Sequence, residues 1–301
     1  MTVIVTHPAC CGHDPGFGHP ESPARLDSVL RAIEDIPLDR HEAPLATEEQ
    51  VLCAHTPALI ETIRFGHGAL DPDTILSEGS YEAALRAAGA ACLATGMVMA
   101  GKAENAFCAV RPPGHHAERN RAMGFCLFNN VAIAALHARA AHNLTRVAVL
   151  DFDHHHGNGT QDIAWNDPDF FFASTHKWPD YPGSGRRDEV GAFNNILNFP
   201  LSGREGSSGF RKCWETAIFP ALAAFQPDFL FVSAGFDGHL ADPVGNLGLT
   251  TEDFAWIGEK LREQAQKLCS GRLVAALEGG YNLAALADST RAFVTALAAK
   301  P

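Results

Sequence analysis

Residues 147–161, VAVLDFDHHHGNGTQ, decide the fold. The first part of this stretch is an apolar, β-branched run of the length of one strand, and the second part is a polar turn. A strand that is apolar on both faces is typical of the buried interior of a parallel sheet. Binding sites in such sheets form beyond the carboxyl ends of the strands, so the acids and histidines here are the first candidates for a site.

Similar short runs recur along the chain and alternate with longer helical patterns. We predict strands at residues 3–6, 106–110, 147–152, 170–174, 196–199, 229–233 and 273–277. We predict helices at residues 80–100, 129–141, 209–225, 251–269 and 283–299, with Ser80 and Thr251 as N-caps. The alternation predicts an α/β fold with a mostly parallel central sheet and helices on both faces. No linker rich in Pro, Ser or Gly divides the sequence, so we expect one domain over residues 1–301.

The composition excludes several classes of protein. The 301 residues are 46% hydrophobic and 19% charged, which is typical of a globular chain. No apolar run reaches the roughly 18 residues that a membrane-spanning helix needs. The formal charge of -12 disfavours nucleic acid and anionic membranes as partners, whereas it suits a cationic substrate. The cysteines form no C-x-x-C pair and the N-terminus lacks the pattern of a signal peptide, so we expect reduced thiols and a cytoplasmic location.

Polar segments follow four of the predicted strands. Because the carboxyl ends of parallel strands meet at one edge of a sheet, we expect these segments to deliver acids, imidazoles and a phenol to one place. The segments are RPPGHH at 111–116, DHHHGNG at 153–159, AGFDGH at 234–239 and EGGY at 278–281.

The segment at 153–159, together with Asp151 and Asp237, has the chemistry of a metal site. Alternate side chains of an extended segment share a face, so Asp151, Asp153 and His155 point the same way. Adding Asp237 from a distant strand end makes a set of three ligands, Asp153, His155 and Asp237, that leaves a position open for water. This is the arrangement of a catalytic zinc site, although carboxylate-rich sites also suit Fe²⁺ or Co²⁺. The alternative is a hydrogen-bonded loop, with Asp237 in a simple turn.

The histidines of the segment at 111–116 have the chemistry of proton transfer. The adjacent His115 and His116 suit general-base and general-acid work beside a metal, although they could also be further ligands or an ordinary polar loop. Asp151 can accept a hydrogen bond from His115, and Asn158 can orient His116 without adding charge. Tyr281 can present its hydroxyl to a carbonyl oxygen on which negative charge develops, although a Gly-Gly-Tyr turn can also be purely structural.

Taken in order, these motifs resemble the histone deacetylase superfamily, which includes bacterial acetylpolyamine amidohydrolases and acetoin-utilisation proteins. The resemblance spans nearly the whole chain. Its motifs are HPE at 19–21 with Pro23 and Arg25-Leu26, RPPGHHA at 111–117, GFC at 124–126, Asn129-Asn130, DFDHHHGNGTQ at 151–161, STH at 174–176, YPGSG at 181–185, SAGFD at 233–237, Asp242-Pro243 and LEGGYN at 277–282.

The resemblance implies a single-domain arginase/deacetylase fold with zinc on Asp153, His155 and Asp237. It also implies a narrow tunnel for an acetylated alkyl chain, lined by Phe125, Tyr181 and Gly124, and a rim residue for the substrate backbone at Asp73. A structural K⁺ is expected at Ser174 together with Asp151, Asp153 and His155. Tyr181 departs from the Phe that many relatives carry, which makes the tunnel slightly more polar.

The same resemblance narrows the substrate without fixing it. Asn158 and Glu278 are similar to the class II branch of the superfamily. Polyamine-specific bacterial relatives carry a long insertion before the helix that begins at residue 80. In this chain the corresponding segment, residues 66–79, is short. We therefore expect a zinc-dependent amidohydrolase that removes acetyl or related acyl groups from primary amines, above all acyl-lysine. The alternatives are an acetylpolyamine or other small-molecule amide deacetylase, an arginase-like ureohydrolase and a non-catalytic acyl-group binder. The oligomeric state stays open.

Overall fold

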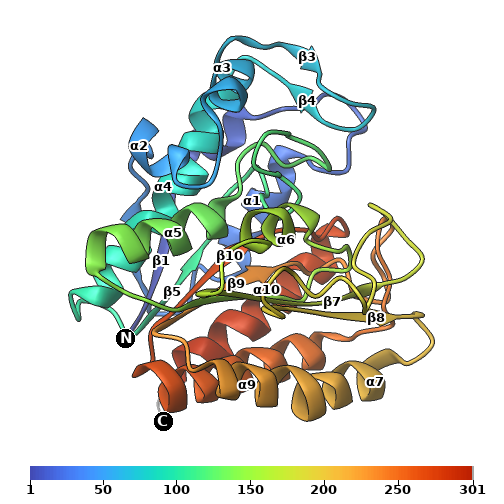
Figure 1. Cartoon of the computed structure of the whole chain (residues 1–301). Helices are drawn as coiled ribbons and strands as arrows, with labels where there is room; N and C mark the ends of the chain where they lie inside the picture. The colour runs from blue at the N-terminus through green and yellow to red at the C-terminus, as the bar shows by residue number, and fades with distance from the viewer. Residues whose placement is uncertain (300–301) are drawn as a thin grey trace.

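The computed structural model describes residues 1–299 of the chain. Within them, a sheet of eight parallel strands runs through the middle of the molecule, in the order β2-β1-β5-β10-β9-β6-β7-β8 (Figure 1). The strands are β1 (Thr2–Thr6), β2 (Asp39–Glu42), β5 (Asn105–Cys108), β6 (Val147–Asp151), β7 (Phe170–Lys177), β8 (Ile196–Leu201), β9 (Phe229–Ala234) and β10 (Leu273–Leu277). The predicted parallel α/β fold is confirmed.

Helices cover both faces of the sheet. The α4, α5 and α6 helices lie against one face, and α7, α9 and α10 lie against the other (Figure 1). Their bounds are α4 (Ser80–Met99), α5 (Asn130–His142), α6 (Asn158–Ala164), α7 (Gly206–Cys213), α9 (Thr251–Cys269) and α10 (Leu283–Ala298). The remaining elements are η1 (Pro8–Gly12), α1 (Pro23–Ala32), α2 (Glu48–Leu52), α3 (Pro57–Phe65), the hairpin β3 (Gly68–Ala69) and β4 (Ile75–Leu76), η2 (Trp214–Ile218) and α8 (Phe219–Phe225).

The central strands are buried on both faces. Every residue of β6, β9 and β10 is inaccessible to solvent, as the continuous apolar runs of these strands require. Phe152 packs at the centre of an aromatic cluster, with ring centroids 5.9 Å from Phe236, 6.1 Å from Phe254 and 5.4 Å from Phe293. This cluster joins the strand ends to α9 and α10, so the segment that carries the candidate ligands starts from a rigid base.

Three local predictions need correction. Helix α4 is capped by Gly79, because the Ser80 hydroxyl instead accepts from the Ser77 amide and contacts His13. Helix α9 is capped by Thr250, which forms a capping box with Asp253. The predicted helix 209–225 is three segments, with a π-helical turn at Trp214–Ile218 before Pro220, a residue that has no N–H to donate.

The helices and the cysteines bear on two of the sequence expectations. Within residues 1–299, every helix is too short or too polar to cross a bilayer. All eight cysteines are free thiols, as predicted, and Cys11 and Cys53 alone among them are partly exposed.

Candidate metal and catalytic site

The polar segments meet at one edge of the sheet. Strands β5, β10, β9 and β6 are neighbours in that order and run parallel, so their carboxyl ends lie side by side. The predicted convergence of the four polar segments is therefore confirmed.

Asp153, His155 and Asp237 form one cluster of buried side chains. Each offers a ligand atom, and these atoms lie within 4.8 Å of one another. Nδ1 of His155 lies 3.2 Å from Oδ1 of Asp153 and 2.9 Å from Oδ2 of Asp237. Backbone amides hold the two carboxylates from behind, because His154 donates to Asp237 at 2.9 Å and Gly279 donates to Asp153 at 2.9 Å. The backbone thus fixes the orientation of both carboxylates.

This cluster fits a divalent metal ion. Oδ2 of Asp237 is buried and receives no hydrogen bond of good geometry, although Nδ1 of His155 lies only 2.9 Å from it. A cation held between these two atoms would satisfy both of them. Two glycines leave the room that the carboxylates occupy: a Cβ on Gly235 would lie 1.9 Å from Oδ2 of Asp153, and one on Gly279 would lie 2.5 Å from Oδ2 of Asp237. Two carboxylates and one imidazole at these distances form a donor set that suits a catalytic zinc or iron ion.

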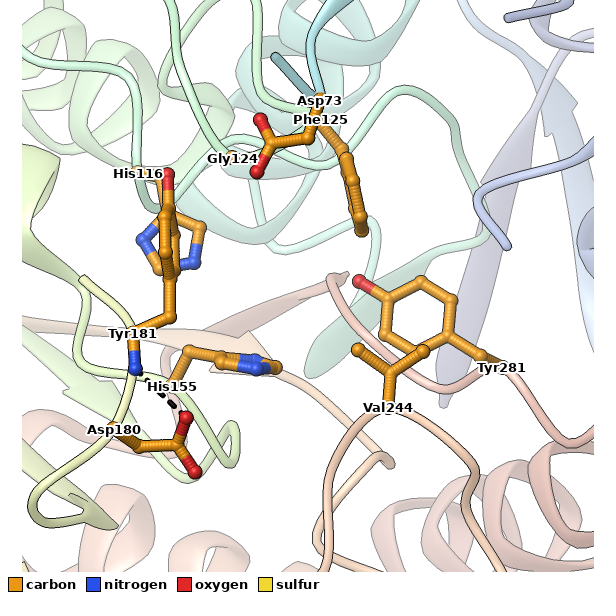
Figure 2. A pocket seen from close by; sticks show the side chains of 9 residues that line it. All are labelled: Asp73, His116, Gly124, Phe125, His155, Asp180, Tyr181, Val244 and Tyr281. Atoms are coloured by element: carbon orange, nitrogen blue, oxygen red, sulfur yellow. Dashed lines mark hydrogen bonds between the residues drawn. The ribbon is translucent and has the colours of Figure 1, made fainter. Parts of the chain in front are cut away.

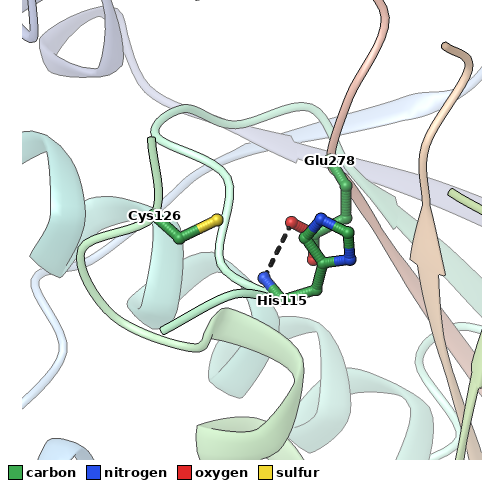
Figure 3. A group of neighbouring side chains, drawn as sticks. All are labelled: His115, Cys126 and Glu278. Atoms are coloured by element: carbon green, nitrogen blue, oxygen red, sulfur yellow. Dashed lines mark hydrogen bonds between the residues drawn. The ribbon is translucent and has the colours of Figure 1, made fainter. Parts of the chain in front are cut away.

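A second group of metal-ligating residue types lies nearby, formed by His115, Cys126 and Glu278 (Figure 3). The atoms of this group that could bind a metal are already hydrogen-bonded or protonated. Oε2 of Glu278 accepts hydrogen bonds from the amides of Gly114 and His115. Burial raises the pKa of the Cys126 thiol well above its usual range, so the thiolate that binds metals is disfavoured. We assign this group to the support of His115.

The two adjacent histidines have different partners, as predicted. Nδ1 of His115 lies 3.0 Å from Oδ2 of Asp151, and Nδ1 of His116 lies 2.8 Å from Oδ1 of Asn158. The Asn158 side chain is itself oriented, because its amide nitrogen donates to Glu118 at 2.8 Å. A carboxylate therefore supports one ring and a neutral amide supports the other.

The different partners separate the pKa values of the two rings. Burial alone would lower the pKa of His115, but the carboxylates of Asp153 and Asp151 raise it to about 10. Burial, together with the positive charges of His115 and His155, lowers the pKa of His116 well below its usual value. These shifts make His115 the charged imidazolium and His116 a neutral imidazole that can accept a proton.

Tyr281 faces the same space from the loop after β10. Its backbone amide donates to Asp242 at 2.6 Å, and its ring meets that of Phe125 edge to face at 5.7 Å. Burial raises the pKa of its hydroxyl well above the usual range, so the group stays protonated and can donate a hydrogen bond.

A cavity of about 250 Å³ opens onto the metal-ligand cluster (Figure 2). The predicted tunnel residues Phe125, Tyr181 and Gly124 and the predicted rim residue Asp73 all line it. The full lining is Asp73, His116, Gly124, Phe125, His155, Asp180, Tyr181, Val244 and Tyr281. Three aromatic rings and Val244 line this cavity together with two carboxylates and two imidazoles, which suits an elongated group with a polar end.

Sequence reasoning missed two supports of this cavity. Asp180 accepts from the Tyr181 amide at 2.8 Å and contacts Nε2 of His154 at 3.1 Å, so it fixes one wall. His19 packs edge to face on Phe125 at 4.7 Å and contacts the Asp73 carbonyl at 3.0 Å, so it fixes the opposite wall. The sequence signal for Asp180 was its position next to Tyr181.

Ser174 lies beside Asp151 in the register of β7 and β6, and its hydroxyl is hydrogen-bonded with Nδ1 of His176 at 2.9 Å. The K⁺ site expected at Ser174, Asp151, Asp153 and His155 stays a prediction.

Comparison with known proteins defines the family. Residues 19–297 match the family model described as "Histone deacetylase domain". "Histone deacetylase 10, chloroplastic" of Oryza sativa subsp. japonica is 39% identical, over 97% of this chain and 73% of that protein. "Histone deacetylase-like amidohydrolase" of Pseudomonas aeruginosa is 37% identical, over 92% of this chain and 75% of that protein. The crystal structure of the HDA15 HD domain superposes with a TM-score of 0.92 at 32% identity, over 99% of this chain and 91% of that one.

The chain therefore belongs to the histone deacetylase family. It has the single-domain α/β fold of that family, and it is a hydrolase of the deacetylase and amidohydrolase class.

Proposed function

We propose that this protein is a zinc-dependent amidohydrolase that removes acetyl groups from primary amines, with acyl-lysine as the preferred substrate. The observation that carries the proposal is the position of the Asp153–His155–Asp237 cluster at the base of a cavity that also presents His116 and Tyr281. A divalent ion on these three ligands would act as a Lewis acid toward the substrate carbonyl and a water molecule. Fe²⁺ or Co²⁺ can fill the same role.

Within the histidine pair, His116 transfers the proton and His115 supplies a fixed charge. His116 lines the cavity, and its lowered pKa leaves it neutral and able to take a proton from the attacking water. The water oxygen forms the new bond to the acetyl carbon, and the imidazolium of His116 then returns the proton to the nitrogen as the carbon–nitrogen bond breaks. His115 remains charged against Asp151 and holds the positive potential beneath the reacting atoms. The products are acetate and the free amine.

Tyr281 stabilises the oxyanion. Its protonated hydroxyl projects into the cavity opposite His116 (Figure 2), where it can donate to the carbonyl oxygen as negative charge develops. Phe125 and Tyr181 enclose the alkyl chain that connects the amide to the rest of the substrate.

The rim favours a peptide over a polyamine. Residues 66–79 form only the short β3–β4 hairpin, and the lining residue Val244 is apolar. Asp73 is half-buried and lines the cavity, and its carboxylate would accept a hydrogen bond from a substrate backbone amide. A rim without a long insertion suits a lysine side chain that enters from a peptide backbone.

The test is acetate release by zinc-loaded protein from an acetyl-lysine peptide and from an acetylated polyamine at equal concentration. An Asp237→Ala preparation purified in parallel controls for contaminating hydrolases. Faster turnover of the peptide supports the proposal, and faster turnover of the polyamine contradicts the assignment of the rim. No release from either substrate contradicts the deacetylase proposal itself.

A further inference from the structure

Glu278 is a fully buried carboxylate that stands behind the histidine pair. It directly follows the last residue of β10, and its side chain points toward the loop that follows β5 (Figure 3). The amides of Gly114 and His115 donate to its Oε2 at 2.6 and 3.1 Å. The hydroxyl of Ser233, in β9, donates to its Oε1 at 3.1 Å. One side chain therefore joins three neighbouring strand ends.

The other side of the His115 backbone is fixed independently. The His115 carbonyl accepts from the amides of Gly159 and Thr160, at 3.0 and 3.2 Å, in the first turn of α6. The loop before His115 has no room to shift toward α5, because a Cβ on Gly114 would lie 2.6 Å from the amide nitrogen of Asn130. Glu278 thus supplies the acceptor for the amide side of a backbone whose carbonyl side is held by α6.

A buried carboxylate is costly unless donors surround it, and three donors contact Glu278. Burial still raises the pKa of Glu278 to about 7, against the opposing effects of His115 and the Gly114 amide. The cavity lining does not include Glu278, so the side chain has no contact with the space that the substrate fills. Its contacts go to the backbone that sets the direction of the His115 and His116 rings. Such contacts orient functional groups without taking part in the reaction.

We propose that Glu278 is a positioning residue that holds the His115–His116 backbone by hydrogen bonds and so aligns His116 with the reacting atoms. This inference rests on the proposed function. The property that matters is the length of the side chain and the position of its acceptor oxygen, because Oε2 accepts from the Gly114 and His115 amides at once.

Two conservative variants separate geometry from charge. Glu278→Gln loses the charge but keeps the length, since its amide oxygen can accept from Gly114 and His115 while its NH₂ donates to the Ser233 hydroxyl. Glu278→Asp keeps the charge but is one methylene too short to contact both amides. We expect kcat of Glu278→Gln to stay within about threefold of wild type and kcat of Glu278→Asp to fall about 10²-fold, with KM unchanged in both.

Each variant is also assayed for bound zinc per chain and for amide hydrogen exchange in the peptide that contains residues 111–117. Glu278→Asp is expected to keep its zinc and to exchange faster in this peptide alone, while Glu278→Gln exchanges like wild type. A purely structural role would raise exchange across the sheet and would not follow this order of variants.

The reverse order of activity, or wild-type kcat in both variants, overturns the inference. Faster exchange across all of β5, β9 and β10 in Glu278→Asp also overturns it. If wild-type protein releases no acetate, the proposed function has failed, and the exchange data still decide whether Glu278 holds the loop.

Discussion

The guanidinium of Arg25 lies over the aromatic ring of Tyr281, with Cζ 4.9 Å from the ring centroid. The same guanidinium donates from Nε to the Gly280 carbonyl at 2.6 Å and from a terminal nitrogen to the Glu278 carbonyl. A buried cation from α1 therefore fixes both the ring and the backbone of the loop that presents Tyr281. Glu21 compensates the charge, because its Oε1 lies 2.9 Å from Arg25.

Replacing Arg25 with Ala should lower the free energy of unfolding by about 3–5 kcal/mol, because one partner of a buried charge cluster is removed while the others stay buried. Urea unfolding monitored by tryptophan fluorescence measures this change. Arg291→Ala is the matched control: Arg291 pairs with Asp35 at the surface, where solvent screens the pair, so its loss should lower the free energy of unfolding far less. Equal losses in the two variants would show that the buried cluster does not stabilise the fold.

Tyr281→Phe removes a single hydroxyl from the cavity. If that hydroxyl donates to the oxyanion, kcat for an acetyl-lysine peptide should fall about 10²–10³-fold while zinc content stays at the wild-type level. Steady-state kinetics and metal analysis on the same preparation test this. Unchanged turnover would remove Tyr281 from the reaction.

Gly124 packs directly against a catalytic ring. A Cβ at this position would lie 2.5 Å from Cδ2 of His116 and 2.9 Å from the Tyr181 hydroxyl, and its φ is +58°. We expect Gly124→Ala to lower kcat/KM by about 10²-fold, because it displaces His116 from its position at the cavity. Gly101→Ala is the control, since Gly101 has φ +67° and open space around it. Similar losses in both variants would point to backbone strain alone.

Glu21 should make stability fall in acid. Burial alone would raise its pKa, but Arg111 and Arg25 lower it from 4.5 to about 2. The unfolded chain therefore takes up this proton first as pH falls, so the stabilisation is complete above pH 4.5 and disappears toward pH 2. The lowered pKa corresponds to about 3 kcal/mol at neutral pH.

Urea midpoints of wild type and Glu21→Gln, measured from about pH 6 to about pH 3, test the role of Glu21. The gap in stability between the two proteins should narrow as the pH falls. A gap that stays constant or widens would contradict the ionised pairing of Glu21 with the two arginines.

The sequence predicts the central strands well because each is a short apolar run buried on both faces. In contrast, β2 has the sequence DRHE, whose polar side chains carry no strand pattern. It forms because β1 pairs with it in register at the sheet edge, an interaction between distant residues that periodicity does not report. The N-cap of α4 differed for a similar reason, because the Ser80 hydroxyl contacts His13 instead.

The candidate site was predictable where side chains follow strands directly. Asp153, His155, Asp237 and the histidine pair follow strand ends, and the topology brings them together. The supports from Arg25, His19 and Asp180 were not assigned roles from the sequence, because their partners lie on elements whose neighbours only the three-dimensional structure defines.

Metal dependence of amide hydrolysis tests the central claim most directly. The protein is stripped with a chelator and titrated with Zn²⁺ while acetate release from an acetyl-lysine peptide is followed, with Asp237→Ala as the ligand-deficient control. The account predicts no release from the stripped protein, full recovery at one ion per chain and no recovery in Asp237→Ala. Acetate release without metal, or two ions per chain accompanied by urea release from a guanidino substrate, would contradict it.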